Sequence, residues 1–266
     1  MKRLCFVILC LCGSAVFGQD SIMWLPKPLF TGSLVLGKCE PLGNFRSGKD
    51  SKHPYSYALP SKHTLSYQLS STWYLYKNTG VSFGFGNNVF MLDTGNITKT
   101  YAALYPGLRV EHYSLYKYTM PVFSAGFSMY WHVKNLYVEP RIMFGMGGMG
   151  SGLFELYLMD QQHNPVKVIR YNAPTSFNLY VRPSLSGIYL IRLARGLKTG
   201  LQATAEYSFI KSSFRYDVVT TDIVSHTTTT SVIKPRPTFG SLGFYGGLLL
   251  WLDFSEVFRS KKIKFY

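Results

Sequence analysis

Two carboxylates and two guanidinium groups are the first candidates for chemistry, because they interrupt segments that are otherwise almost free of charge. Glu139 and Arg141 lie two residues apart, and Arg182 and Glu206 belong to two later segments. Carboxylates held inside a protein can transfer protons, and a row of charges can also form a path for ions. Side chains of opposite charge can instead neutralise one another as ion pairs. We interpret these four residues as a structural charge cluster rather than a catalytic one.

The other reactive side chains show no spacing that is typical of a metal or catalytic site. No histidines have the separation of zinc ligands; they are His53, His63, His112, His132, His163 and His226. Glu111, His112 and Ser114 would suit a lipid-modifying enzyme, but in an extended segment Glu111 points to the opposite face. We therefore expect no catalytic residue, no metal and no cofactor.

The segments that carry the four charges alternate between apolar and polar residues, which is typical of strands with one apolar face. In 65–75, odd positions are mainly leucine, tyrosine and tryptophan, and even positions are mainly serine, glutamine and threonine. A change of parity near Met120 and Pro121 indicates a bulge within one long strand. The pattern predicts eight strands, at 30–38, 65–75, 81–91, 108–131, 136–146, 177–191, 197–209 and 239–254.

The connections between these strands alternate in length, so both ends of the chain fall on the side of the tight turns. The tight turns are at 78–80, 132–135 and 192–196, and the long connections are at 39–63, 94–107, 150–174 and 212–235. Opposed residues of a hairpin must share a face. A register with Ile191 opposite Leu197 meets this condition, and it places Arg182 opposite Glu206 as an ion pair.

The polar face of the strands indicates which side is the interior. It carries serine, glycine, asparagine, glutamine, threonine and tyrosine, whereas the polar face of a soluble barrel would be rich in lysine and glutamate. It suits the crowded interior of a narrow barrel, and the apolar face suits lipid. A closed barrel leaves no unpaired edge in hydrocarbon, so it can span without helices. Aromatic residues that suit the interfacial girdles are Trp73, Tyr118, Trp131, Tyr189, Tyr207 and Trp251.

Residues 1–18 have the pattern of a secretory signal peptide, with a positive start, a short apolar stretch and small residues before the cleavage site. We expect cleavage between Gly18 and Gln19. The apolar stretch is too short to span a bilayer comfortably. Cleavage would leave Cys39 as the only cysteine, so no internal disulfide could form. We expect the barrel to lie within 19–254.

Residues 30–254 resemble the small eight-stranded bacterial outer-membrane barrels, such as OmpX and the membrane domain of OmpA. The resemblance rests on the signal peptide, the alternation of apolar and polar residues, and the alternation of tight turns with long connections. The resemblance implies an all-β fold: a closed, antiparallel, up-and-down transmembrane barrel with short periplasmic turns and long extracellular loops. It also implies a porin-like place in the outer membrane of a Gram-negative cell envelope, and an interior plugged by charges. Such barrels usually end on an aromatic residue, and Tyr266 is aromatic. The segment 255–266 is therefore either a basic tail or the end of the last strand.

Composition narrows the class and the partners. Of 266 residues, 47% are hydrophobic and only 15% charged, against about a quarter in ordinary soluble domains. The formal charge is +15. The clearest cations lie in or beside the long loops, where anionic lipopolysaccharide would sit; they are Arg46, Lys49, Lys52, Lys62, Lys167, Arg170, Lys211, Arg215, Lys234 and Arg236. An ordinary solvated loop surface is the other interpretation. We expect membrane lipid and lipopolysaccharide as partners, and no nucleic acid because the chain is exported.

The last long connection, 212–235, contains two β-prone runs, 218–222 and 227–233. We expect strands seven and eight to continue beyond the membrane as a protruding hairpin, whose edge could pair with a strand of a protein partner. A mobile, threonine-rich surface loop is the alternative.

These observations predict a monomeric, non-enzymatic outer-membrane barrel with a structural or surface-interaction role and long basic loops facing the cell exterior. One alternative is a barrel enzyme or narrow pore that uses the lumenal charges. A second is a membrane component of an envelope secretion or assembly machine. A third is a soluble secreted barrel that binds an apolar ligand.

Overall fold

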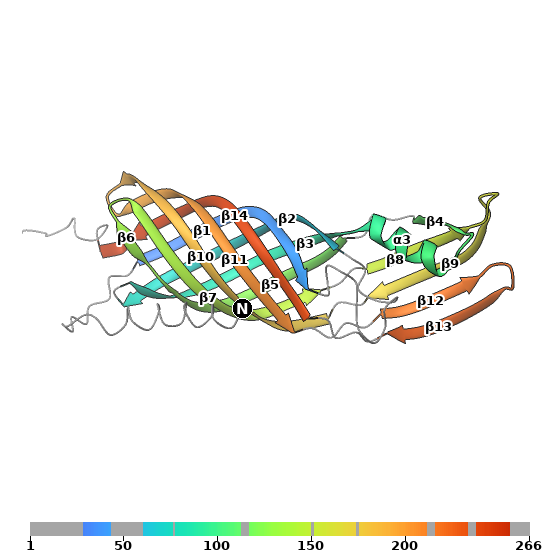
Figure 1. Ribbon diagram of the computed structural model, residues 1–266. Coiled ribbons are helices and arrows are strands. Elements are labelled where there is room, and N and C mark those ends of the chain that lie inside the picture. The colour runs from blue at the N-terminus through green and yellow to red at the C-terminus, as the bar shows by residue number, and fades with distance from the viewer. Residues whose placement is uncertain are drawn as a thin grey trace, which may run out of the picture.

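The alternating segments pair side by side and close into a barrel in the computed structural model (Figure 1). Each strand of the ring is antiparallel to its neighbours; β1 pairs with β14, and β7 with β10. The ring follows chain order, which confirms the predicted eight-stranded up-and-down barrel. Its strands are β1 (Leu29–Gly43), β2 (Ser61–Tyr76), β3 (Thr79–Leu92), β5 (Lys117–Met129), β7 (Leu136–Met149), β10 (Ser176–Ala194), β11 (Leu197–Lys211) and β14 (Thr238–Asp253).

The structure describes most of the chain between Leu29 and Ser255. The expected cleavage site at Gly18 and Gln19, the signal region 1–18 and the segment 256–266 lie outside the described residues. The described residues are 29–43, 61–76, 78–112, 117–149, 152–173, 176–211, 216–233 and 238–255.

Short turns join the strands at one end of the barrel. A three-residue strand, β6 (Trp131–Val133), extends the edge of β7 next to one turn. Lys134 and Gly196 have φ values of 55° and 73°, a left-handed backbone that suits a two-residue hairpin. Leu29 pairs with Asp253, so the first and last barrel strands also meet at this end. The described parts of the long connections lie at the opposite end, as predicted.

Side-chain orientation follows the alternation of the sequence. Leu69, Phe127 and Leu248 on the outer surface are 55%, 60% and 63% exposed, whereas Ser82 and Ser186 inside the barrel are fully buried. The apolar belt therefore faces outward, as in outer-membrane barrels. This arrangement is the reverse of a soluble barrel with an apolar interior, so that alternative is wrong.

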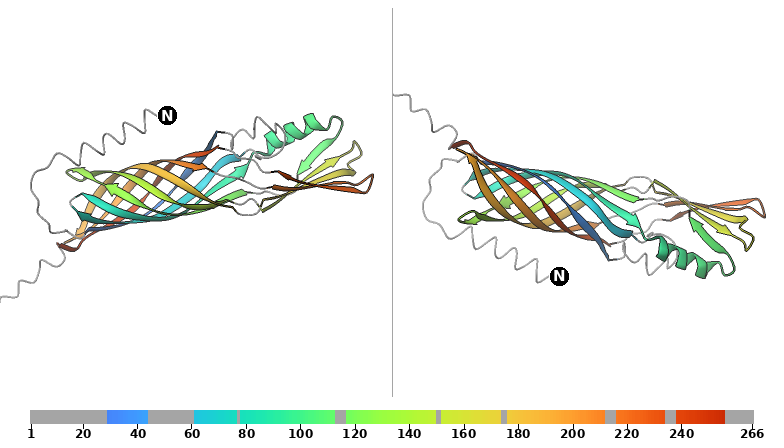
Figure 2. Two further views of the ribbon diagram at one scale, coloured as in Figure 1. Left: turned by 90° about the horizontal axis from the view of Figure 1, so that it is seen from below. Right: turned by 90° about the horizontal axis from the view of Figure 1, so that it is seen from above.

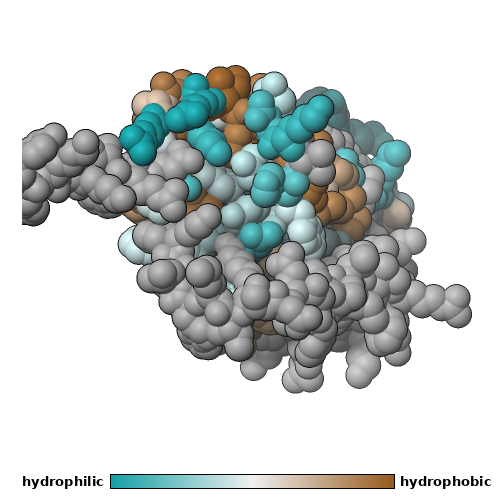
Figure 3. Space-filling model, turned by 90° about the vertical axis from the view of Figure 1, so that its left-hand side faces the viewer, coloured by the Kyte–Doolittle hydropathy of each residue, from teal (hydrophilic) through white to brown (hydrophobic). Residues whose placement is uncertain are grey.

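The aromatic residues only partly follow the predicted girdle. Trp73, Trp131 and Tyr189 are exposed on the outside, but Trp251 is buried inside the barrel, because odd-numbered residues of β14 point inward. Viewed from the short-turn end, hydrophilic residues gather on the end of the molecule and hydrophobic residues appear beside them (Figure 3). No helix among the described residues is long and apolar enough to cross a membrane.

Beyond the other end of the barrel, the described parts of the three later long connections fold into a second sheet with a helix against it, which we call the outer module (Figures 1 and 2). The sheet has the order β13-β12-β9-β8-β4. Its elements are α3 (Thr94–Leu104), β4 (Arg109–His112), β8 (Gly152–Met159), β9 (Pro165–Ala173), β12 (Tyr216–Asp222) and β13 (Thr227–Ile233). The hairpin of β12 and β13 confirms the expected strands in 212–235, but 94–107 and 150–174 are not plain loops.

The single long strand predicted over 108–131 is wrong. Residues 109–112 form β4, which pairs with β8 in the outer module, and the barrel strand β5 starts at Lys117. Pairing of β3 with β5 runs through Met120 and Pro121 without a shift, so the described ladder has no bulge there. The apolar parity changes because Met120 and Val122 fill the interior, where they are 2% and 1% exposed.

Glycines let strands approach closely inside the narrow ring. A Cβ on Gly247 would collide with the carbonyl oxygen of Leu34 and with Cα of Val35 on β1. The neighbouring Gly246 is different, since the nearest atom to its Cβ would be the carbonyl oxygen of Gln202 at 4.0 Å. These adjacent residues therefore differ in whether a side chain fits.

We expect Gly247→Ala to lower the free energy of unfolding by about 1–3 kcal/mol, because the strands must move apart to admit the methyl group. Gly246→Ala is the matched control and should change it by less than about 0.5 kcal/mol. Urea titration of the refolded barrel in detergent, followed by the shift of the unboiled band in SDS gels, measures both. Equal losses for the two variants would contradict this packing.

Candidate functional site

The interior of the barrel is layered along its axis. At the short-turn end, a cluster of buried residues fills the lumen; it comprises Leu29, Tyr74, Tyr137, Ile188, Leu190, Leu249 and Trp251. The middle is a polar layer in which the charged side chains lie. At the other end, Cys39, Phe90, Met120, Val122 and Tyr180 form an apolar layer that continues into the outer module. The predicted charge cluster therefore lies between two apolar layers.

Aromatic rings make the layer at the short-turn end tight. The ring of Trp251 lies 4.8 Å from that of Tyr137, 5.3 Å from Tyr130 and 6.1 Å from Tyr74, between centroids. The ammonium group of Lys198 lies 5.9 Å from the rings of both Tyr137 and Trp251. Such contacts between rings add to the stabilisation from burial alone. Trp251 thus closes this end of the lumen from within.

The first pair of lumenal charges is Glu139 and Arg141 on β7. The Nη2 atom of Arg141 lies 2.7 Å from Oε2 of Glu139, and both side chains are almost fully buried. The hydroxyl of Tyr74 donates to the other carboxylate oxygen over 2.5 Å. Arg141 also donates to the hydroxyl of Ser70 over 2.7 Å. Both oxygens of the Glu139 carboxylate are therefore engaged.

The second pair is Arg182 on β10 and Glu206 on β11, whose Nε and Oε2 atoms lie 3.3 Å apart. The expected ion pair is present, but the predicted register is off by two residues, since Ser184 lies opposite Glu206. The strands run further into their turn than predicted, with a shift between Arg192 and Ala194, and Arg182 reaches its partner diagonally.

Further hydrogen bonds hold the second pair. The amide of Gln68 donates to Oε2 of Glu206 over 2.9 Å, and the hydroxyl of Ser208 donates to Oε1 over 3.2 Å. Arg182 donates from Nη2 to the hydroxyl of Ser124 over 3.2 Å. Together with the pair itself, these partners lie on the four strands β2, β5, β10 and β11, so the charged layer ties opposite walls of the barrel together.

A small cavity separates the two ion pairs. Its volume is about 20 Å³, and Arg141, Arg182, Gln202 and Glu206 are among the residues that line it. A water molecule needs roughly 10–15 Å³ by the same measure. Arg141 Nε, Arg182 Nη1 and Gln202 Oε1 are buried without a hydrogen-bond partner in the protein. The cavity is thus polar and has room for about one water molecule.

The weaker candidates for chemistry are not brought together. Glu111 lies on β4, where its carboxylate is 3.8 Å from Arg109 and 3.6 Å from the ring of His163. The side chain of His112, and Ser114, lie outside the described residues. In the described part of the chain, no group of three histidine, cysteine, aspartate or glutamate residues could hold a metal ion.

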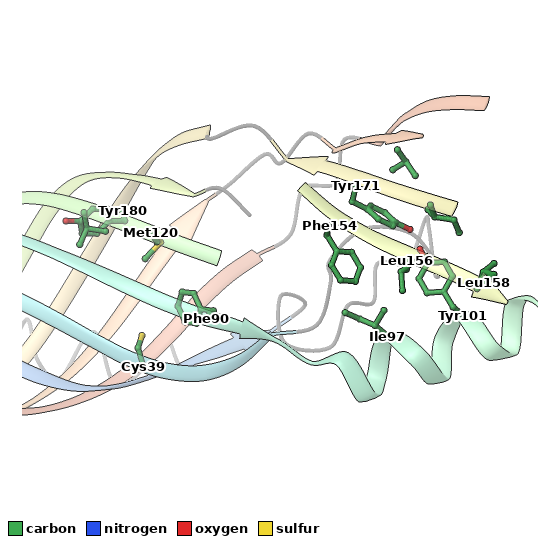
Figure 4. Packing of buried hydrophobic residues seen from close by; sticks show 13 residues of the cluster. Cys39, Phe90, Ile97, Tyr101, Met120, Phe154, Leu156, Leu158, Tyr171 and Tyr180 are labelled. Carbon is green, nitrogen blue, oxygen red and sulfur yellow. The ribbon is translucent and has the colours of Figure 1, made fainter. Parts of the chain in front are cut away.

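The outer module is joined to the barrel by one continuous apolar core (Figure 4). Asp93 caps α3 by accepting from the backbone N–H of Asn96, and the helix buries Ile97 and Tyr101. These two residues share a cluster with Phe154, Leu156, Leu158, Ile169, Tyr171 and Val218 of the sheet, and with the apolar layer at the barrel mouth. Apolar side chains therefore fill the junction between the barrel mouth and the module.

Two of the ten predicted basic residues have acidic partners within the outer module. Lys167 lies 3.7 Å from Asp222, and Arg170 lies 2.6 Å from Glu155. The side chains of the other eight lie outside the described part. The backbone N–H of Ser225 donates to Asp222 and lowers the pKa of its carboxyl group, so the carboxylate that closes the tip of the hairpin is ionised at neutral pH.

No protein-family model matches the chain, and no curated protein matches it in sequence. Among solved structures, a major outer membrane protein from Thermus thermophilus is 12% identical, with a TM-score of 0.45 over 84% of this chain and 99% of that one. Outer membrane protease OmpT from Escherichia coli is 10% identical, with a TM-score of 0.41 over 88% and 99%. Ail, the attachment invasion locus protein of Yersinia pestis, is 9% identical, with a TM-score of 0.37 over 84% and 99%.

We expect Arg182→Met and Glu206→Gln each to lower the free energy of unfolding by about 3–5 kcal/mol, because each leaves one buried group without its partner. The double variant should lose clearly less than the sum of the two. Urea titration of the four proteins in the same detergent gives the coupling free energy. Additive losses would mean that the two side chains do not stabilise each other.

Proposed function

We propose that this protein is a non-enzymatic barrel of the outer membrane that holds the outer module at the cell exterior for surface interaction. The observation that carries the proposal is the apolar core shared by the barrel mouth and the outer module, which supports a module held at the long-connection end of the barrel. The belt of exposed apolar side chains suits contact with lipid. Lipopolysaccharide beside the basic loops belongs to the same proposal.

The layered lumen supports a structural role for the four charges. Each carboxylate faces an arginine at hydrogen-bond or ion-pair distance, and apolar layers lie on both sides of them. A conduction path needs continuous water, and eight strands leave room for little more than side chains. A proton-transfer site needs a group that can reach a substrate. The filled lumen favours neither continuous water nor contact between these charges and a substrate.

We expect an epitope inserted in the β12–β13 turn, between Ser225 and His226, to be labelled by antibody on intact cells. The same epitope between Arg195 and Gly196, at the short-turn end, is the matched control and should be labelled only after permeabilisation. Both insertions lie in turns, so the barrel should still fold, which the heat-dependent SDS band checks. Labelling of the control on intact cells would overturn the proposed orientation.

We also expect the purified barrel to show no ion steps in planar lipid bilayers, because the lumen is filled along its axis. Trp251→Ala should not open a path, since the charged layer and the outer apolar layer remain. Regular conductance steps in the wild-type protein, abolished by Glu206→Gln, would instead favour the narrow-pore alternative.

A further inference from the structure

Within the part of the chain that the structure describes, the outer module ends in an open strand edge. In the described sheet β13 is the terminal strand, bonded to β12 over seven consecutive residue pairs without a shift. Residues 227–232 are all exposed. An edge strand of this kind presents a row of backbone N–H and C=O groups that can pair with another strand.

The two edges of the sheet are not alike. The opposite edge, β4, is only four residues long, and Arg109 and Glu111 on it lie 3.8 Å apart. Strand β13 has the sequence TTTTSVI, with no charge and no proline. Proteins commonly protect an edge with short strands, charges, proline or bulges. None of these devices is present along β13.

The paired side of β13 indicates which kind of strand suits its open side. Its neighbour β12 is antiparallel and also rich in threonine and valine. Thr221 and Thr228 lie opposite each other with hydroxyl oxygens 3.4 Å apart, and Thr220 lies opposite Thr229. Threonine pairs of this kind stabilise neighbouring strands. A second uncharged strand of threonine, serine and valine would match the open side without burying a charge.

We propose that the open edge binds β13 of a second copy of this chain, antiparallel and centred on Thr230, and that the two copies are anchored in facing membranes. In this register Thr228 opposes Val232, Thr229 opposes Ser231 and Thr230 opposes its own copy, so the contact is self-complementary. The strand itself is neutral, so no like charges face each other within the contact. The proposal rests on the outward position of the module.

The direction of β13 requires that the two paired copies be anchored in two different, facing membranes. The strand runs from the far tip of the module back toward the barrel, roughly along the long axis of the molecule (Figure 1). Two copies in one membrane would place these strands parallel, whereas copies in facing membranes place them antiparallel, like β12 and β13.

One such contact is small. A strand of seven residues is about 23 Å long, and pairing along one edge buries less surface than a stable interface of roughly 1,600 Å². Many copies in each membrane would bind together through avidity, because each contact raises the effective concentration for the next. The interaction is thus weak between single molecules and strong between surfaces.

The test uses full-length protein in two populations of lipid vesicles that carry a donor and an acceptor dye. We expect the wild-type protein to bridge them, and protein-free vesicles not to. Thr230→Lys on both populations should reduce bridging by about fivefold or more, and so should Thr230→Glu on both, because like charges then face each other across the contact. Mixing Thr230→Lys vesicles with Thr230→Glu vesicles should restore bridging.

Two outcomes would overturn the proposal. One is no bridging by the wild-type protein, and the other is loss in both variants without rescue on mixing. Thr230 is exposed, so both variants should fold, and the heat-dependent SDS band checks this. If bridging fails while the epitope in the β12–β13 turn is labelled on intact cells, the self-pairing is wrong but the proposed function stands. If that epitope is not labelled, the proposed function itself falls.

Discussion

The structure depends on closing a ring of strands in a medium that offers no hydrogen bonds. Hydrocarbon cannot satisfy backbone groups, so every barrel strand must pair on both sides. Eight strands meet this condition with a lumen so narrow that side chains must fill it. Polar residues there must bond to one another, and charges must be paired. The Glu139–Arg141 and Arg182–Glu206 pairs follow from this constraint.

The same constraint explains how much of the barrel could be predicted from sequence. A strand with lipid on one side and a polar lumen on the other alternates at every residue, so its pattern is encoded locally. The pattern does not encode which two residues lie opposite each other, because a shift of two positions leaves every side chain on the same face. For this reason the predicted register puts Arg182 opposite Glu206, whereas the two residues are diagonal neighbours. The errors at Met120 and Trp251 have one cause: both ends of the lumen are apolar, so alternation loses its contrast there.

Most of the outer module could not be predicted from the sequence, for a different reason. Its sheet joins β4, β8, β9 and β12, which come from three separate connections, and β4 has only four residues. Pairing of this kind is non-local and leaves little trace in any one segment. A signal is present in Phe154, Leu156 and Leu158, which alternate and are fully buried. The threonine-rich hairpin is predictable, because its two strands are adjacent in sequence and both are rich in β-branched residues.

The shared core between barrel and outer module also affects how the open edge of β13 is oriented. If the module hung on flexible connections, β13 could turn in any direction, and copies in one membrane could pair. Ile97, Tyr101 and Phe154 share one cluster with Phe90 and Tyr180 of the barrel, and this shared packing favours one direction of the strand relative to the membrane. Antiparallel pairing of β13 then joins copies in facing membranes and not copies in the same membrane. A packing contact inside one molecule thereby decides the geometry between two membranes.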